Sequence, residues 1–275
     1  MVSQLVVRGG VPLSGEITVR GAKNFVSKSM VASLLTKETS VLRNVPQIRD
    51  VTVVSELLGL HGVAVNYQPE AGTGDITPGD IHLPHDPHEV NALAGSSRIP
   101  ILFAGPLLHR LGEAYIPDLG GCHIGSRPVD FHLRVLEEFG AKRVQEEAGM
   151  HLVAPKGLRA KPVRLPYPSV GATEQTLLTA VMAEGVTELS NAAVEPEIMD
   201  LIAVLQKMGA IISVDTDRVI RVEGVDELVG YSHTSLPDRI EAGSWAAAAL
   251  ATGGDIFVRG AEQQSMTSFL NLFRK

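Results

Sequence analysis

An internal repeat constrains the fold of this chain more than any other feature of its sequence. Three stretches share one order of features: an apolar helix, a short β-rich stretch, a turn, an amphipathic helix and a glycine-led return to strand. The turn positions Asn44, Asp118 and Asn191 are about 73 or 74 residues apart, by subtraction of their numbers. Repeated units bury their apolar faces against one another. Three copies therefore predict one mixed α/β core around inward-facing helices.

Apolar spacing and bounding residues predict the elements within each copy. A helical period covers 196–208 in the third copy and 128–139 in the second, and each helix is followed by glycine. The first helix of the first copy, around Met30, is apolar over much of its circumference, which is typical of an interior helix. Short β-rich stretches bounded by turn residues predict strands at 40–45, 113–117, 151–155, 187–191 and 211–215.

The length of 275 residues suggests about two domains. We expect one complete three-copy domain over 22–236. The stretches 1–21 and 237–275 then form an incomplete second domain, because a fourth copy begins near 239 and only half of it precedes the last residue.

Composition excludes several classes of function. A formal net charge of −7 at pH 7 without a run of Lys or Arg argues against nucleic-acid binding. One cysteine allows no internal disulfide and no CxxC site, and nine histidines lack metal-site spacing, so no metal is expected. No P-loop or GxGxxG motif occurs, so no organic cofactor is expected. Without a long apolar run or a signal-peptide pattern, we expect a cytoplasmic protein that makes no membrane contact.

Five motifs in order carry a resemblance to a known family. They are GAKN at 21–24, GGC followed by RPVD within 120–130, SVGATEQTLL at 169–178, NAAVEPEIMDL at 191–201 and LPDRIEAGS at 236–244. Together they resemble the UDP-N-acetylglucosamine enolpyruvyl transferases. The resemblance implies two domains, each an inside-out α/β barrel of three βαβαββ units, with substrates bound between them. It also implies that the enolpyruvyl group of phosphoenolpyruvate passes to the 3′-hydroxyl of UDP-N-acetylglucosamine, the first committed step of peptidoglycan synthesis and so of cell-wall biogenesis.

Cys122 lies in a glycine-rich segment, which favours an accessible thiol, and Arg127 nearby would lower its pKa. A small buried side chain is the alternative that the residue type alone leaves open. The resemblance implies that Cys122 is the general acid that protonates the methylene carbon of phosphoenolpyruvate and that it can form a covalent adduct with it.

Cations stand at two equivalent helix starts. Lys23, beside Asn24, begins the first helix of copy one, and Arg98 opens that of copy two. Helix N-termini attract anions, and guanidinium binds phosphate with two parallel hydrogen bonds. Solvated side chains are the alternative. The resemblance implies that Lys23, Asn24 and Arg98 contact the substrates, although the family usually has RAS where this chain has RIP after Ser97.

Further substrate contacts follow from the resemblance. Around the nucleotide it implies Arg127, Pro128, Val129 and Asp130, and at the next helix start Ser169, Val170 and Gly171. Helix capping is the alternative for both groups, and Tyr167 stands where the family often has lysine. Asp238 and Arg239 fit an ion pair at a domain crossing as well as a ligand contact.

The implied chemistry is addition followed by elimination, with phosphoenolpyruvate and UDP-N-acetylglucosamine as partners. The family's aspartate base and a further phosphate-binding arginine fall outside the stretch represented here, so no residue is assigned to either role. Two alternatives stay open: a fragment that only binds the sugar nucleotide, and a shikimate-type enolpyruvyl transferase.

Overall fold

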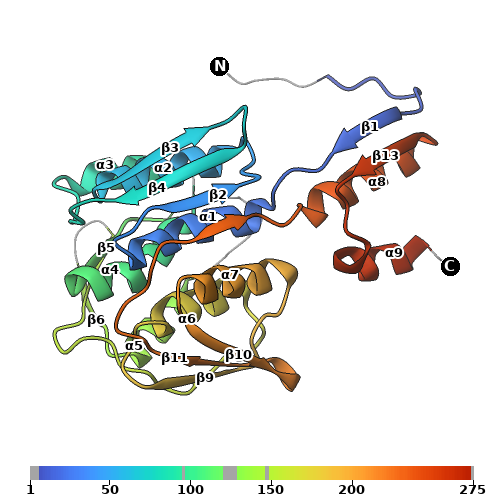
Figure 1. The fold of residues 1–275 in the computed structure, drawn as a ribbon. Helices are drawn as coiled ribbons and strands as arrows, with labels where there is room; N and C mark the ends of the chain where they lie inside the picture. The colour runs from blue at the N-terminus through green and yellow to red at the C-terminus, as the bar shows by residue number, and fades with distance from the viewer. Residues whose placement is uncertain (1–5, 95–96, 120–128, 146–148, 274–275) are drawn as a thin grey trace. The chain divides into compact units, whose positions relative to one another are not determined.

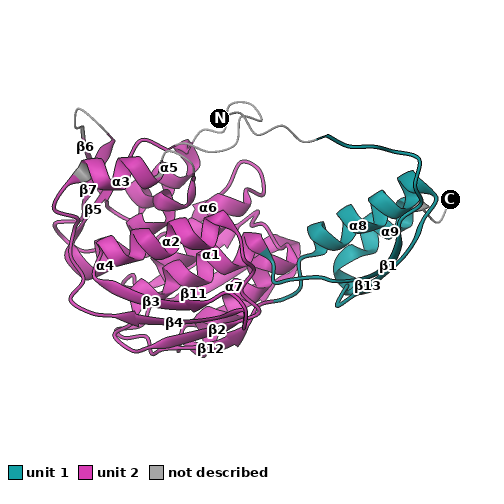
Figure 2. Cartoon of the chain, turned by 90° about the horizontal axis from the view of Figure 1, so that it is seen from above, with its two compact units in different colours: residues 1–22, 236–275 teal, residues 23–235 magenta. Residues whose placement is uncertain are grey.

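The structure, a computed structural model, describes residues 6–94, 97–119, 129–145 and 149–273. The chain divides into two compact units. Unit 1 comprises Met1–Ala22 with Leu236–Lys275, and unit 2 comprises Lys23–Ser235 (Figure 2). Unit 2 contains the three stretches that share the repeat.

Two four-stranded sheets of unit 2 have the same strand order. The first runs β12 (Ser232–Thr234), β2 (Ser40–Arg43), β4 (Thr73–Pro78), β3 (Val63–Gln68). The other runs β8 (Val163–Arg164), β9 (Val186–Ser190), β11 (Val219–Glu223), β10 (Ile211–Asp215). In both sheets the first two strands are parallel and the others antiparallel. This shared order is the βαβαββ unit, and β12 completes the first copy from the far end of unit 2.

In the part of the chain that the structure describes, the sheet of the second copy has three strands, one fewer than the other two sheets of unit 2. It runs β5 (Glu113–Ile116), β7 (Met150–Val153), β6 (Lys142–Gln145), all antiparallel. Among the described residues no strand takes the place that β12 and β8 have in the other sheets. The short helix α3 (Pro87–Ala94) precedes this copy instead. The expected βαβαββ unit is thus fully formed in two of the three copies.

The first helix of each copy lies in the interior of unit 2. These helices are α1 (Lys23–Ala32) continued by η1 (Ser33–Leu35), η2 (Ile99–Phe103) continued by α4 (Ala104–Leu111), and α6 (Val170–Ala180). Every residue of α1 from Phe25 on and every residue of α6 from Ala172 on is buried. In Figure 1, β2–β4 run along α1 and β9–β11 run along α6, as in an inside-out α/β arrangement.

The second helices of the copies are amphipathic and pack beside the interior ones. They are α2 (Arg49–Leu60), α5 (Asp130–Glu138) and α7 (Pro196–Lys207). A separate short 3₁₀ turn, η3 (Thr216–Arg218), joins β10 to β11. The helix expected over 196–208 is confirmed as α7. The one expected over 128–139 is observed from Asp130 on, and Pro128 lies outside the described residues. All five expected strands are present as β2, β5, β7, β9 and β10.

The repeated turn has the same chemistry in two copies. Asn44 and Asn191 adopt left-handed backbone conformations, with φ of 55° and 59°, which asparagine tolerates well. The Asn44 side-chain amide donates to the Ser235 carbonyl at 3.0 Å, and that of Asn191 donates to the Leu165 carbonyl at 2.9 Å. Both acceptors directly follow the first strand of their sheet, β12 or β8. Each asparagine therefore fastens its turn to the same point of its own copy.

Unit 1 contains a parallel strand pair and two helices. Strand β1 (Ser14–Thr18) pairs with β13 (Asp255–Arg259), and the helical elements are α8 (Arg239–Thr252), η4 (Gln263–Met266) and α9 (Thr267–Phe273). Its buried core consists of Val19, Ala242 and Met266. Large apolar side chains are exposed on both kinds of element, namely Ile240, Leu250, Phe257 and Leu272. Within the described residues, neither unit contains a helix with the length and hydropathy needed to cross a bilayer.

Candidate functional site

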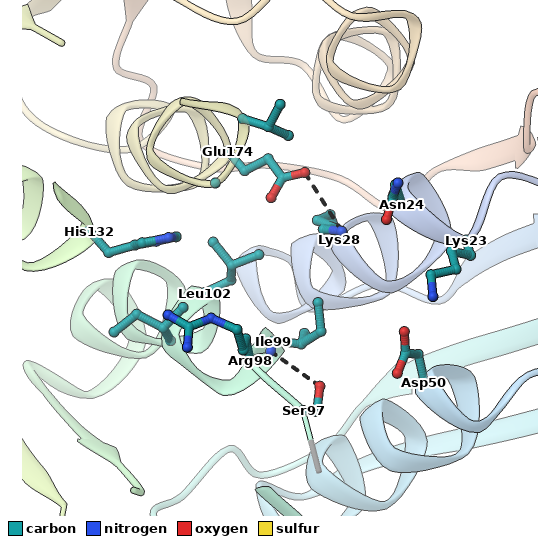
Figure 3. A pocket seen from close by; sticks show the side chains of 13 residues that line it. Lys23, Asn24, Lys28, Asp50, Ser97, Arg98, Ile99, Leu102, His132 and Glu174 are labelled. Carbon is teal, nitrogen blue, oxygen red and sulfur yellow. Dashed lines mark hydrogen bonds and ion pairs between the residues drawn. The ribbon is translucent and has the colours of Figure 1, made fainter. Parts of the chain in front are cut away.

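A cavity of about 470 Å³ opens in unit 2 where the first helices of the three copies begin. Figure 3 shows side chains from α1, η2 and α6 around it. Its lining residues are Lys23, Asn24, Lys28, Asp50, Ser97, Arg98, Ile99, Ile101, Leu102, His132, Val170, Gly171 and Glu174.

The repeat explains why helix starts meet at this cavity. Lys23 is the first residue of α1, Arg98 is the N-cap residue of η2, and Val170 is the first residue of α6. The first N–H groups of a helix have no partner within it and carry partial positive charge. Three such starts around one cavity, two of them with cationic side chains, favour an anionic ligand.

Side-chain hydroxyls hold two of these helix starts in place. Ser97 Oγ accepts from the Ile99 N–H at 3.2 Å, and Ser169 Oγ accepts from the Ala172 N–H at 3.3 Å. Ser169 is the N-cap residue of α6. The capping alternative for Ser169 is therefore present in the structure, directly beside the cavity-lining Val170 and Gly171.

An ion pair closes one side of the cavity. Lys28 Nζ lies 3.8 Å from Glu174 Oε1, and both side chains are nearly buried. Burial raises the pKa of Glu174 to about 7; Lys28 opposes this rise, and the carboxylates Glu197 and Glu195 add to it. A carboxyl group in this environment exchanges its proton near neutral pH.

His132 contributes a neutral ring to the opposite side. Burial lowers the pKa of His132 to about 4, and the positive charge of Arg98 lowers it further, against a weak hydrogen bond with Gln175 and the charge of Asp130. Its Nδ1 lies 3.4 Å from Gln175 Oε1. A Cβ on Gly171 would lie 2.7 Å from Nε2, so the ring fits only against a glycine. At pH 7 the side chain offers hydrogen bonds without charge.

The structure brings five of the residues expected from the sequence into the wall of this cavity. They are Lys23, Asn24, Arg98, Val170 and Gly171. Asp130 is the first residue of α5 and influences His132 electrostatically, whereas Val129 is the N-cap residue of that helix; neither lines the cavity. Cys122, Arg127 and Pro128 lie outside the described residues.

Asp238 and Arg239 belong to unit 1. Asp238 is the N-cap residue of α8, where its Oδ1 accepts from the Ile240 and Glu241 N–H groups at 2.8 and 3.1 Å. Arg239 is the first residue of the same helix. Asp238 in the PDRIE sequence therefore caps α8, and an aspartate cap stabilises a helix start.

Sequence reasoning missed Lys28, Asp50, Ser97, His132 and Glu174 in the cavity wall. For two of them a signal exists. Lys28 lies four residues after Asn24, and Glu174 four after Val170, so each shares a helix face with a residue at the helix start. Charged residues inside helices that are otherwise apolar are seldom buried unless they are paired. Among the described residues no cluster of His, Cys, Asp and Glu has the arrangement of a metal site.

Comparisons with known proteins identify the family of the chain. The family model of EPSP synthase (3-phosphoshikimate 1-carboxyvinyltransferase) matches residues 7–275. UDP-N-acetylglucosamine 1-carboxyvinyltransferase of Protochlamydia amoebophila is 44% identical over 98% of this chain and 59% of its own length. The enzyme of that name from Acidiphilium cryptum is 47% identical over 94% of this chain and 61% of its own length. The chain thus spans about 60% of these relatives.

Solved structures show the same fold at low sequence identity. The enolpyruvyl transferase NikO of Streptomyces tendae superposes with a TM-score of 0.74 at 22% identity, over 86% of this chain and 55% of NikO. An EPSP synthase of Acinetobacter baumannii gives 0.72 at 19% identity, over 92% of this chain and 57% of the synthase. Fold, repeat and family model agree, and the chain belongs to the EPSP synthase family of enolpyruvyl transferases.

Proposed function

We propose that this chain carries the cationic cavity of a UDP-N-acetylglucosamine 1-carboxyvinyltransferase. That enzyme moves the enolpyruvyl group of phosphoenolpyruvate to the 3′-hydroxyl of UDP-N-acetylglucosamine and releases phosphate. The observation that carries the proposal is the meeting of three helix starts, with Lys23 and Arg98, at one cavity of an enolpyruvyl transferase fold. Both substrates are anions, and such a cavity attracts anions.

Lys23 and Arg98 are proposed to hold the phosphate and carboxylate groups of phosphoenolpyruvate. The planar guanidinium of Arg98 forms two parallel hydrogen bonds to such groups, whereas the ammonium of Lys23 acts as a point charge. Their fixed positions stabilise the charge that develops during addition. The proposed contacts of the sugar nucleotide are Asn24, Arg127, Pro128, Val129, Asp130, Ser169, Val170 and Gly171.

Cys122 is proposed as the proton donor. In the addition step its proton goes to the methylene carbon of phosphoenolpyruvate, the 3′-oxygen of the sugar nucleotide bonds to the adjacent carbon, and the 3′-hydroxyl proton passes to a general base to which no residue of this chain is assigned. In the elimination step the bond between carbon and the phosphate oxygen breaks, and the methyl group returns a proton to the Cys122 thiolate, which gives the enol ether and inorganic phosphate. We propose that this reaction supplies peptidoglycan synthesis, and thereby cell shape and division, in the cytoplasm.

The sugar-nucleotide branch of the family is favoured over the shikimate branch. Relatives named for UDP-N-acetylglucosamine are 44–47% identical over at least 94% of the chain. The likeness to the solved EPSP synthase is 19% in sequence and supports the fold alone. The second candidate is a chain that binds the sugar nucleotide without turnover, a role that the cations and helix starts of the cavity are sufficient to support.

One assay tests all three functions. We expect the chain to release phosphate from phosphoenolpyruvate when UDP-N-acetylglucosamine is present, and Cys122→Ala to abolish that release while sugar-nucleotide binding persists. Release that needs shikimate 3-phosphate instead would assign the chain to the other branch. Binding of UDP-N-acetylglucosamine by calorimetry without any phosphate release would establish the binding-only function.

A further inference from the structure

Lys28 and Glu174 are ionisable residues in the cavity that the proposed reaction does not use. Lys28 comes from α1 and Glu174 from α6, and Figure 3 shows their charged groups pointing toward each other at one side of the cavity. Glu174 is 4% exposed and Lys28 9%. Their 3.8 Å separation is long for a charge-assisted hydrogen bond, which is typically about 2.7–2.9 Å. The pair is therefore held loosely, and both members line the space that a ligand would fill.

We propose that Lys28 is a further anion-binding cation of this cavity, and that Glu174 makes its charge available to the ligand by taking up a proton when an anion binds. The ligand class is a phosphate or diphosphate ester. The choice of a sugar nucleotide as probe rests on the proposed function, whereas the coupling between anion and proton does not.

Formal charges show what the proton changes. Within the part of the chain that the structure describes, the cavity wall contains three cationic side chains and the two carboxylates Asp50 and Glu174. With Glu174 ionised their sum is +1, and with Glu174 protonated it is +2. The second state matches a diphosphate diester, which carries two negative charges. Because Glu174 is buried beside the ligand, a negative ligand and a negative Glu174 repel each other with little screening.

Three charged groups around Glu174 affect whether it ionises. Glu197 in the first turn of α7 and Glu195, the N-cap residue of that helix, act on it with like charge, and Lys28 on α1 acts on it with opposite charge. One carboxylate oxygen of Glu195, Oε2, is buried without a hydrogen-bond partner among the described residues. Burial and two carboxylates thus oppose ionisation of Glu174, and Lys28 favours it. An anion that draws Lys28 toward itself removes that one favourable contact.

His132 is another titratable group beside the cavity that an anion would affect. It comes from α5, and Arg98 and Asp130 are the charges that act on it. An anion would favour its protonated form too. The experiment must therefore distinguish a proton taken up by Glu174 from one taken up by His132.

Calorimetry on the 275-residue chain makes this distinction, with UDP-N-acetylglucosamine as the probe. Its diphosphate diester does not titrate between about pH 6 and pH 8.5, so any pH dependence belongs to the protein. We expect wild-type affinity to fall roughly tenfold across this range, the effect of about one pKa unit of coupling. At about pH 7, buffers of different ionisation enthalpy should report net proton uptake.

Two variants carry the proposal. Glu174→Gln, which keeps the shape and stays neutral, should abolish both the pH dependence and the proton uptake. Lys28→Met should weaken binding at about pH 6, where it lowers the formal charge of the wall from +2 to +1. At about pH 8.5 it should leave binding nearly unchanged, because without Lys28 the buried Glu174 stays protonated and the formal charge remains +1. A structural ion pair would instead give a loss that does not depend on pH.

Two controls accompany them. Glu138→Gln alters a carboxylate paired with Arg134 on an exposed surface and should behave as wild type. His132→Asn should retain the proton uptake. Uptake that persists in Glu174→Gln, or that disappears only in His132→Asn, would overturn the proposal.

Failure of the proposed function gives a different result. If the chain does not bind UDP-N-acetylglucosamine at all, inorganic sulfate replaces it, and carbon NMR follows the titration of the Glu174 carboxyl. Sulfate should then move the titration midpoint of Glu174 upward. An unchanged midpoint at saturating sulfate would overturn the inference independently of the enzyme's identity.

Discussion

Glu174, which is buried, and His132, which is partly buried, are two groups of the cavity wall whose pKa values are displaced in opposite directions. Burial raises the pKa of Glu174 from 4.5 to about 7 and lowers that of His132 from 6.5 to about 4. In both cases the uncharged form is favoured, because burial penalises charge. The two groups therefore have opposite effects on how stability depends on pH over nearly the same interval.

The sign of each effect follows from proton counts. Between about pH 4.5 and 7 folded Glu174 keeps a proton that the unfolded chain has lost, so the free energy of unfolding falls as pH rises, by about 3 kcal/mol. Between about pH 4 and 6.5 the unfolded chain holds the proton that folded His132 lacks, so stability rises with pH by a similar amount.

We predict that single substitutions reveal these opposing contributions. The free energy of unfolding of Glu174→Gln, relative to wild type, should increase as pH rises from about 4.5 to 7. That of His132→Asn, relative to wild type, should increase as pH falls from about 6.5 to 4. Urea unfolding at about pH 4.5, 6 and 7.5 measures both. Parallel curves for wild type and Glu174→Gln would contradict the displaced pKa of Glu174.

Some residues of the candidate site could be predicted from the sequence and others could not. Lys23 and Arg98 were predicted because the repeat gives them equivalent helix starts, and a helix start has a known preference for anions. Glu174 was not predicted, because its role depends on facing Lys28 from another copy. Such a contact is set by three-dimensional packing and leaves no local pattern in the sequence.

The capped start of α6 is the element that links stability to the site most directly. Ser169 accepts the Ala172 N–H, and the next two residues line the cavity. A serine cap satisfies one of the helix-start N–H groups that have no partner within the helix. The cap therefore fixes the orientation of the N–H groups that the ligand would meet.

We predict that Ser169→Ala lowers the free energy of unfolding by about 1 kcal/mol through loss of this cap. Ser55→Ala is the matched control. Its hydroxyl bonds to the Val51 carbonyl within α2, a bond that adds little to helix stability. Chemical unfolding of both variants tests the difference, and equal values would show that the cap contributes nothing.

Elements differ in how well the sequence predicts them. Helix α7 was predicted because its apolar period is regular and proline and glycine bound it. Helix α3 was not, because it is short and Val90 is its one side chain described as buried. Strands β8 and β12 contain two and three residues. They form because they pair with β9 and β2, and a local sequence pattern does not show such pairing.

On the scale of the whole molecule, the two units differ in how much apolar surface they bury. Unit 2 has three interior helices, whereas the buried core of unit 1 is Val19, Ala242 and Met266. In α8, Ala242 is the one buried residue. Local stability follows the burial of apolar contacts, so unit 1 should open at lower free-energy cost than unit 2.

We predict that hydrogen exchange separates the two units. Amides of β1, β13 and α8 should exchange much faster than those of α1 and α6, because opening of unit 1 exposes little buried surface. Mass spectrometry of peptic peptides measures this, with β9 and β11 as strand controls from unit 2. Equal protection of β13 and β11 would contradict the prediction.

The cavity at three helix starts also has a consequence for how such a protein diversifies. Each copy of the repeat supplies one wall: a lysine with an asparagine, an arginine on a 3₁₀ turn, and a serine-capped start with a glycine. The walls are encoded in stretches far apart in the gene, so a substitution in one leaves the other two intact. On the proposed function, substitutions in one copy would change which acceptor the cavity binds, while the other two copies would retain their contacts to the anion.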